Sequence, residues 1–196
     1  MSVAILLLAA GDSTRMGTSK QLLDIGGTPL LVHSVKIALQ SGLHPVTVVL
    51  GAHAEEHRRI IQSLPVDVVV HEDWQLGMGS SLKAGLRHLL NQSVKPEAVV
   101  VLVCDQPRLT AQHIQALVAT YRKERKSIVA SRYGDTDGVP VLFAESLFDE
   151  LLGLPDGHGA KKIIGGHGDV SRVGFDEGGI DLDTPEDYEA YNISRG

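Results

Sequence analysis

Several short runs of aliphatic residues in this sequence lack the polar alternation of a strand with one face in water. The clearest is Ala98–Val103, which reads Ala-Val-Val-Val-Leu-Val. Such a pattern is typical of strands buried on both faces, as in parallel sheets covered by helices. We predict six strands, at residues 3–8, 46–50, 66–70, 98–103, 127–130 and 139–143.

Helical patterns fill the intervals between these runs. We expect helices at 29–39, 54–63, 79–90, 110–124, 145–152 and 185–191. Thr110 and Thr184 are suitable N-caps, and Pro185 suits a first helical turn. The alternation predicts an α/β fold, a three-layer Rossmann-like open sheet that is mostly parallel. We take residues 1–196 as a single domain.

The composition of the chain limits the classes of molecule that it can bind. The net charge is -6 and the pI about 5.8, which argues against binding of nucleic acid or an anionic membrane. Cys104 is the single cysteine, so no internal disulfide forms. The apolar residues 3–10 are too short to span a bilayer, and they lack the basic segment of a secretory signal. We expect a cytoplasmic location.

The first predicted strand runs into a glycine-containing loop, residues 8–23. Gly11 and Gly17 let backbone N–H groups approach an anion, while Arg15 and Lys20 add positive charge. Neither G-x-x-x-x-G-K-[ST] nor G-x-G-x-x-G is present in this loop, which disfavours a dinucleotide fold. Ligands of open α/β sheets bind beyond the carboxyl ends of strands. The loop is therefore either a phosphate cradle or an ordinary surface loop.

The loop sequence Leu-Ala-Ala-Gly-x-Ser-x-Arg-Met-Gly-x-x-Lys-x-Leu-Leu resembles a family signature. It is similar to nucleotidyltransferases with a glycosyltransferase-A-like Rossmann fold, above all the molybdenum cofactor cytidylyltransferases and related guanylyltransferases. The resemblance implies that Arg15 and Lys20 bind the triphosphate and take part in catalysis. It places the base and phosphates along the backbone of four residues: Leu8, Ala9, Ala10 and Gly11. Ala10, where the guanylyl enzymes have glycine, favours CTP.

A second motif, Trp-x-x-Gly-Met-x-Ser-Ser-Leu at residues 74–82, also resembles a nucleotide-contacting stretch of this family. It implies nucleotide contacts for Gly77, Ser80 and Ser81. From the residues alone, the serines open a helix whose free N–H groups attract an anion. The alternative is an ordinary glycine turn with a serine N-cap, which would have the same sequence pattern. Lys83 is either a phosphate contact or a surface lysine.

Two carboxylates are candidate metal ligands. Asp105 ends a buried strand, and Asp183 lies in Asp-Leu-Asp-Thr-Pro-Glu-Asp at residues 181–187. Mg²⁺ needs few protein carboxylates, because phosphates and waters complete its octahedron. Both segments resemble metal-binding elements of the family, which assigns Mg²⁺ to Asp105 and Asp183. The alternative for each segment is a structural cap, and Asp181 is assigned no role.

Two further segments resemble the acceptor side of the family. Gly-x-Pro-x-x-Phe at residues 138–143 and Gly-x-Gly-Ala-Lys at residues 157–161 imply acceptor contacts for Gly138, Pro140 and Lys161. A basic helix surface is the alternative for Lys161. The segment 53–57 matches H-x-x-E-H, a zinc-protease pattern. Because no further ligand set accompanies it, we interpret it as a surface charge cluster.

The resemblance implies transfer of CMP from CTP to a phosphate of molybdopterin, with release of pyrophosphate, and a delivery partner for the finished cofactor. The open alternatives are a guanylyltransferase, and a cytidylyltransferase acting on a sugar or polyol phosphate. An alternative of another class is a non-catalytic nucleotide-binding regulator or cofactor chaperone.

Overall fold

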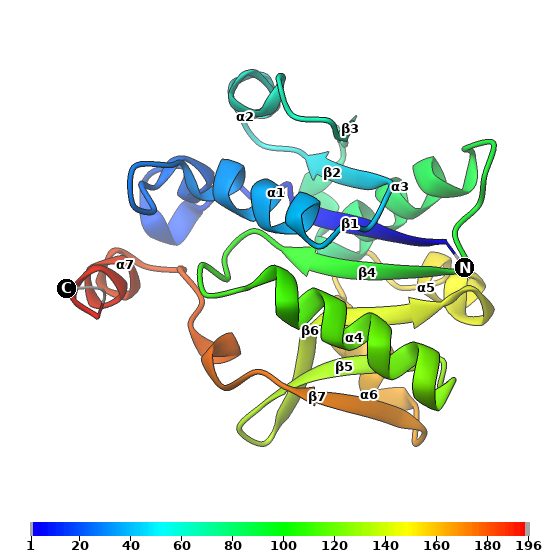
Figure 1. Cartoon of the computed structure of the whole chain (residues 1–196). Helices are drawn as coiled ribbons and strands as arrows, with labels where there is room; N and C mark the ends of the chain where they lie inside the picture. The colour runs from blue at the N-terminus through cyan, green and yellow to red at the C-terminus, as the bar shows by residue number, and fades with distance from the viewer. Residues whose placement is uncertain (1, 195–196) are drawn as a thin grey trace.

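A computed structural model describes residues 2–194, which form one seven-stranded sheet flanked by helices on both faces (Figure 1). The strand order is β3-β2-β1-β4-β6-β5-β7. The pairs β1–β2, β1–β4, β2–β3 and β5–β7 are parallel. The predicted α/β class with a mostly parallel open sheet is confirmed.

All predicted strands and helices are present, with boundaries shifted by a few residues. The strands are β1 Val3–Ala9, β2 Val46–Leu50, β3 Asp67–Val70, β4 Ala98–Val103, β5 Ile128–Tyr133, β6 Thr136–Ala144 and β7 Val170–Gly174. The α-helices are α1 Leu30–Gln40, α2 Ala54–Ile61, α3 Met78–Leu90, α4 Ala111–Glu124, α5 Phe148–Leu152, α6 Lys161–Gly166 and α7 Pro185–Ile193. Within residues 2–194, no helix has the length and apolar character needed to cross a membrane.

The absence of polar alternation in the central strands has the predicted cause. Successive side chains of a strand point to opposite faces, and both faces of β1 are covered. Ile5 and Leu7 pack into a core with α1 and α4, and these helices lie over the face turned to the viewer in Figure 1. Leu6 and Leu8 pack into a second core with α3, α5 and α6.

Three features differ from the sequence prediction. The strand predicted at 139–143 is antiparallel to both of its neighbours, because only a short turn joins β5 to β6 and such a turn reverses the chain. The strand predicted at 66–70 is a partly exposed edge strand instead of a fully buried one. Helix α6 and strand β7 were not predicted, although Val170–Gly174 pairs along its whole length with β5.

Helix α3 lies close to the sheet at Gly85, where an added side chain would meet two residues of the sheet. A Cβ on Gly85 would fall 2.7 Å from Val49 Cγ2 and would also overlap Leu6. The apolar face of α3 packs on β1 and β2 through this contact. The close approach fixes the distance between the sheet and the loop that precedes α3.

We therefore expect Gly85→Ala to lower the free energy of unfolding by about 1–2 kcal/mol, because overpacking outweighs the gain in helix propensity. The matched control is Gly165→Ala in α6, where the added methyl group would meet open space. That change is expected to be neutral or stabilising by up to ~1 kcal/mol. Urea unfolding measures the free energy of unfolding of both variants. An equal increase in the two variants would contradict a close contact between α3 and the sheet at Gly85.

His113 on α4 is a second buried contact, beneath the β5–β6 hairpin. Its Nε2 lies 2.7 Å from Ser131 Oγ, and its ring stacks on Phe175 with centroids 4.4 Å apart. Burial lowers the pKa of His113 to about 4. The unfolded chain therefore binds this proton more tightly than the folded protein. The contribution to stability is present above about pH 6.5 and is lost as the pH falls towards 4.

Replacing His113 with Gln keeps a donor near Ser131 but removes the titration. Between pH 7 and pH 4, the wild type should lose roughly 1–3 kcal/mol more stability than His113→Gln, given about 1.4 kcal/mol per pKa unit. Denaturant unfolding at a series of pH values measures this difference. Parallel pH profiles for the two proteins would contradict the assignment.

Candidate functional site

Three segments that are distant in the sequence meet at one edge of the sheet. Strands β1 and β4 run side by side with Leu8 opposite Val103, so the loops that follow them are neighbours. The segment before α7 joins them, because Leu182 N donates to the Asp105 carbonyl at 3.0 Å. The predicted binding edge, beyond the carboxyl ends of the strands, therefore gathers residues from both ends of the chain.

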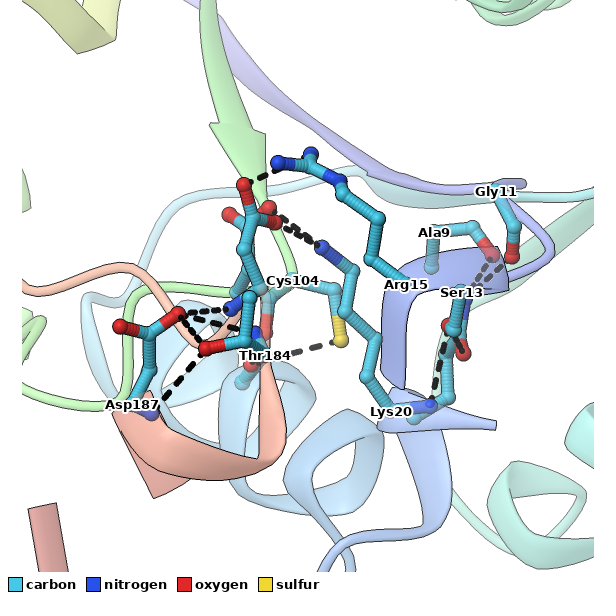
Figure 2. A network of polar contacts seen from close by, with 12 residues as sticks. Ala9, Gly11, Ser13, Arg15, Lys20, Cys104, Thr184 and Asp187 are labelled. Carbon is cyan, nitrogen blue, oxygen red and sulfur yellow. Dashed lines mark hydrogen bonds and ion pairs between the residues drawn. The ribbon is translucent and has the colours of Figure 1, made fainter. Parts of the chain in front are cut away.

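Four predicted charged residues form one ion-pair cluster at this edge. Lys20 Nζ lies 2.8 Å from Asp105 Oδ2 and 3.1 Å from Asp183 Oδ1. Arg15 Nη2 lies 2.8 Å from Asp183 Oδ2. Figure 2 shows Arg15 and Lys20 extending from the glycine-rich loop towards the same group of carboxylate oxygens. The structure thus brings both predicted phosphate-binding cations to both predicted metal carboxylates.

A helix cap holds Asp183 in place. Thr184 Oγ1 accepts a hydrogen bond from Asp187 N at 3.2 Å, and Asp187 Oδ2 accepts one from Thr184 N at 2.8 Å. This reciprocal capping box satisfies the first turn of α7. Asp187 Oδ2 also accepts from Asp183 N at 3.2 Å. The predicted cap and the predicted metal ligand are therefore parts of one local structure, and Figure 2 shows Thr184 beside Asp187.

A cavity of about 300 Å³ opens between the end of β1 and the start of α3. Many of the predicted nucleotide and metal residues line it: Leu8, Ala9, Ala10, Gly11, Lys20, Gly77, Ser81 and Asp105. Arg15 lines an adjoining hollow of about 280 Å³, which also includes Lys20 and Asp183. Sequence reasoning missed six further lining residues: Gln21, Trp74, Gln75, Met78, Val103 and Cys104. For Trp74 and Met78, the sequence indicated a place in the site only through the motif at residues 74–82, which contains both.

The start of α3 differs from the prediction. The N–H groups of Gly79 and Ser80 already donate to the Asp156 carbonyl, at 2.8 and 3.3 Å, so they are not free to bind an anion. Ser80 faces inwards, with its hydroxyl 2.9 Å from His71 Nε2, and it is absent from the cavity lining. Lys83 likewise pairs with Asp156, at 2.6 Å. Glycine at position 79 permits this packing, because a Cβ there would collide with carbonyl oxygens of the 155–158 loop.

The electrostatics of the cluster suit a divalent cation. Burial alone would lower the pKa of Lys20, but the adjacent Asp105 and Asp183 raise it overall, so the ammonium stays charged. The residue Asp181 is exposed overall. Partial burial of its carboxyl group and the charges of Asp105 and Asp183 nevertheless raise the pKa of Asp181 to about 6. Excess negative charge on three neighbouring carboxyl groups is what a bound cation would offset.

The donor set fits a hard divalent cation such as magnesium. Within residues 2–194, no three His, Cys, Asp or Glu side chains are grouped closely enough to hold a metal ion by themselves. A site of two carboxylates leaves most of the coordination to phosphates and water, as Mg²⁺ prefers. Asp105 and Asp183 would hold the ion, each now paired with Lys20.

Two of the three predicted acceptor residues, Gly138 and Lys161, lie near this cluster on the β5–β6 side. A Cβ on Gly138 would collide with the Tyr133 hydroxyl and lie 3.3 Å from Lys161 Cε, so these groups crowd together. The positive charge of Lys161 partly offsets the rise in the pKa of Asp181, so Lys161 is within electrostatic range of the acidic cluster. Pro140 is buried within β6, where its carbonyl accepts from Ser131 Oγ at 2.6 Å. It shapes the strand from within the sheet.

The H-x-x-E-H segment is the expected surface charge cluster only in part. His53, Glu55 and Glu56 are exposed, but His57 is completely buried. Its Nε2 lies 2.7 Å from Ser19 Oγ. His53 sits at the N-cap of α2 with a left-handed φ of 54°. The two rings are 6.2 Å apart.

The model of the MobA-like NTP transferase domain matches residues 5–171. The chain belongs to this family. The match includes the glycine-rich loop, the α3 motif and Asp105, whereas Asp183 lies beyond it.

Individual relatives extend the likeness over the rest of the chain. The purine catabolism protein PucB of Bacillus subtilis is 31% identical over 201 residues, covering 94% of this chain and 93% of PucB. The nicotine blue oxidoreductase of Paenarthrobacter nicotinovorans is 35% identical over 140 residues, covering 70% of this chain and 65% of that protein. The structure of Rv0371c from Mycobacterium tuberculosis in complex with manganese matches with a TM-score of 0.82 and 27% identity, covering 99% of this chain and 100% of that one.

Cys104 lines the cavity but is not poised as a nucleophile in this MobA-like nucleotidyltransferase. Burial and the neighbouring Asp105 raise the pKa of its thiol to about 12, and the residue is 3% exposed. Iodoacetamide at pH 8 should therefore modify the folded protein at least ~100-fold more slowly than the urea-unfolded chain. Mass spectrometry reads the reaction directly, because Cys104 is the single cysteine. Similar rates in both states would contradict this account.

Proposed function

We propose that this MobA-like nucleotidyltransferase transfers CMP from CTP to a phosphate of molybdopterin, releasing pyrophosphate in a Mg²⁺-dependent reaction. The observation that carries the proposal is the ion-pair cluster of Arg15, Lys20, Asp105 and Asp183 beside the 300 Å³ cavity. It combines cations for phosphates with carboxylates for a metal. The proposal treats residues 1–196 as one catalytic domain acting in the cytoplasm.

The chemistry needs no protein nucleophile. An oxygen of the acceptor phosphate attacks the α-phosphorus of CTP, and the bond from that phosphorus to the bridging oxygen of the β-phosphate breaks. Arg15 and Lys20 stabilise the negative charge that develops on the departing pyrophosphate. Asp105 and Asp183 would hold Mg²⁺, which would supply further positive charge to the phosphates. Catalysis then consists of positioning and charge stabilisation.

The end of β1 supports a pyrimidine base. Ala10 is 6% exposed, and its carbonyl accepts from Ala52 N at 3.0 Å. Gly51 must remain glycine, because a Cβ there would lie 2.5 Å from Trp74 Cβ. A methyl group at position 10 within this close packing leaves less room for a base than glycine would. This favours cytosine over guanine.

The name of one relative raises a rival class, since nicotine blue oxidoreductase is an oxidoreductase. The loop after β1 has no G-x-G-x-x-G sequence, and its side chains form a cation–carboxylate cluster instead of a dinucleotide turn. We therefore favour nucleotidyl transfer for this chain.

The choice of acceptor rests on the family resemblance and on Lys161. Lys161 crowds against Gly138 beside the acidic cluster, where its ammonium would pair with the acceptor phosphate. A sugar or polyol phosphate offers the same group. The test is pyrophosphate release from CTP or GTP with Mg²⁺, using molybdopterin, a sugar phosphate or a polyol phosphate as acceptor. Turnover with CTP and molybdopterin is expected; turnover with GTP or another acceptor alone, or tight CTP binding without any pyrophosphate release, would overturn the proposal.

Removing one metal carboxylate should abolish most of the activity. We expect Asp105→Asn to lower kcat by about 100-fold or more, because one of the two carboxylates of the metal site is lost. The isosteric change should leave the circular dichroism spectrum unaltered. The matched control is Asp149→Asn on α5. This carboxylate is exposed, and it lies at the edge of the sheet opposite the ion-pair cluster, because β6 is antiparallel to β4. Turnover of Asp105→Asn close to that of the control would refute the metal assignment.

A further inference from the structure

The second histidine of the H-x-x-E-H segment is buried, and the site described above does not include it. His57 is 0% exposed, and its Nε2 lies 2.7 Å from the hydroxyl of Ser19 in the glycine-rich loop. Helix α2 thereby contacts the residue that directly precedes Lys20. Buried polar side chains in folded proteins almost always have a hydrogen-bond partner, and for His57 that partner is Ser19.

Proton counting fixes the direction of this contact. Ser19 has one hydroxyl proton, and it donates to Gln21 Oε1 at 2.9 Å. His57 Nε2–H must then be the donor to Ser19 Oγ. His57 Nδ1 is buried and has no hydrogen-bond partner among residues 2–194, which fits an unprotonated nitrogen. Burial, the largest cause, lowers the pKa of His57 and favours this neutral form.

The chain of hydrogen bonds ends on the backbone of the nucleotide loop. Gln21 is 1% exposed, and its amide donates to the carbonyls of Ala9 at 3.2 Å and Gly11 at 2.9 Å. Its Oε1 also accepts from Ser13 Oγ at 3.2 Å. With Ser19, all four hydrogen-bonding positions of the amide are used.

Lys20 lies between Ser19 and Gln21 in the sequence. Its backbone N–H donates to Ser13 Oγ at 3.0 Å, while Ser19 and Gln21 on either side are held by the network. The side chain that pairs with Asp105 and Asp183 thus emerges from a backbone that is fixed on both sides.

We propose that His57 is a positioning residue that acts through Ser19 and Gln21 to hold Lys20 and the carbonyl groups of Ala9 and Gly11 in their nucleotide-binding arrangement. The inference rests on the proposed function for the importance of Lys20 to nucleotide binding. The hydrogen-bond network itself does not depend on which nucleotide binds. His57 touches no nucleotide in this scheme.

The test compares two buried histidines with the same chemistry. His113 Nε2 also lies 2.7 Å from a serine hydroxyl, that of Ser131, but it packs under the β5–β6 hairpin. We expect His57→Leu to weaken CTP binding about 10–100-fold and to accelerate amide hydrogen exchange in residues 9–21. His57→Gln, which retains a donor near Ser19, should restore CTP affinity to within about threefold of wild type. His113→Leu should lower stability without changing either quantity.

Ser19→Ala provides a second test in case His57→Leu does not fold. It removes the hydroxyl that joins His57 to Gln21. It is expected to reproduce both effects of His57→Leu. Normal CTP affinity and normal exchange of residues 9–21 in His57→Leu or in Ser19→Ala would overturn the inference. If wild-type protein binds no CTP, the proposed function fails. The exchange measurement, which needs no ligand, still decides the inference.

Discussion

The ammonium group of Lys20 between Asp105 and Asp183 is the interaction on which the site depends. Its contacts of 2.8 and 3.1 Å join the loop after β1, the end of β4 and the segment before α7. Carboxylates placed this close to one another repel unless a cation lies between them. Lys20 supplies that cation here, and a metal ion with triphosphate would supply it during turnover. The same charges therefore stabilise the fold and prepare the site.

The scaffold supports this cluster from three directions. Parallel pairing of β1 with β4 places Leu8 beside Val103, so the glycine-rich loop and Asp105 leave the sheet together. The capping box at Thr184 orients Asp183. The buried amide of Gln21, next to Lys20 in the sequence, donates to the carbonyls of Ala9 and Gly11 and so ties the Lys20 segment to the end of β1. All four hydrogen-bonding positions of the Gln21 amide are used, which is the condition for burying a polar group at little cost.

The sequence predicted the elements whose signal is local. Ala98–Val103 was recognised as a buried strand because no polar residue interrupts it, and Thr184 was recognised as a cap followed by Pro185 in the first helical turn. The positions of β7 and His57 were not predicted, since each depends on a partner distant in sequence. Val170–Gly174 becomes a strand by pairing with β5, and His57 is buried by Ser19, 38 residues away. The free N–H groups expected at α3 were already taken by Asp156, for the same reason.

The measurement that tests the central claim most directly is a crystal structure of the protein with CTP and Mg²⁺. The account predicts the cytosine ring in the cavity against Ala10 and Ser81, the metal on Asp105 and Asp183, and Arg15 and Lys20 on the triphosphate. A triphosphate bound away from Lys20, or a metal on other residues, would contradict it.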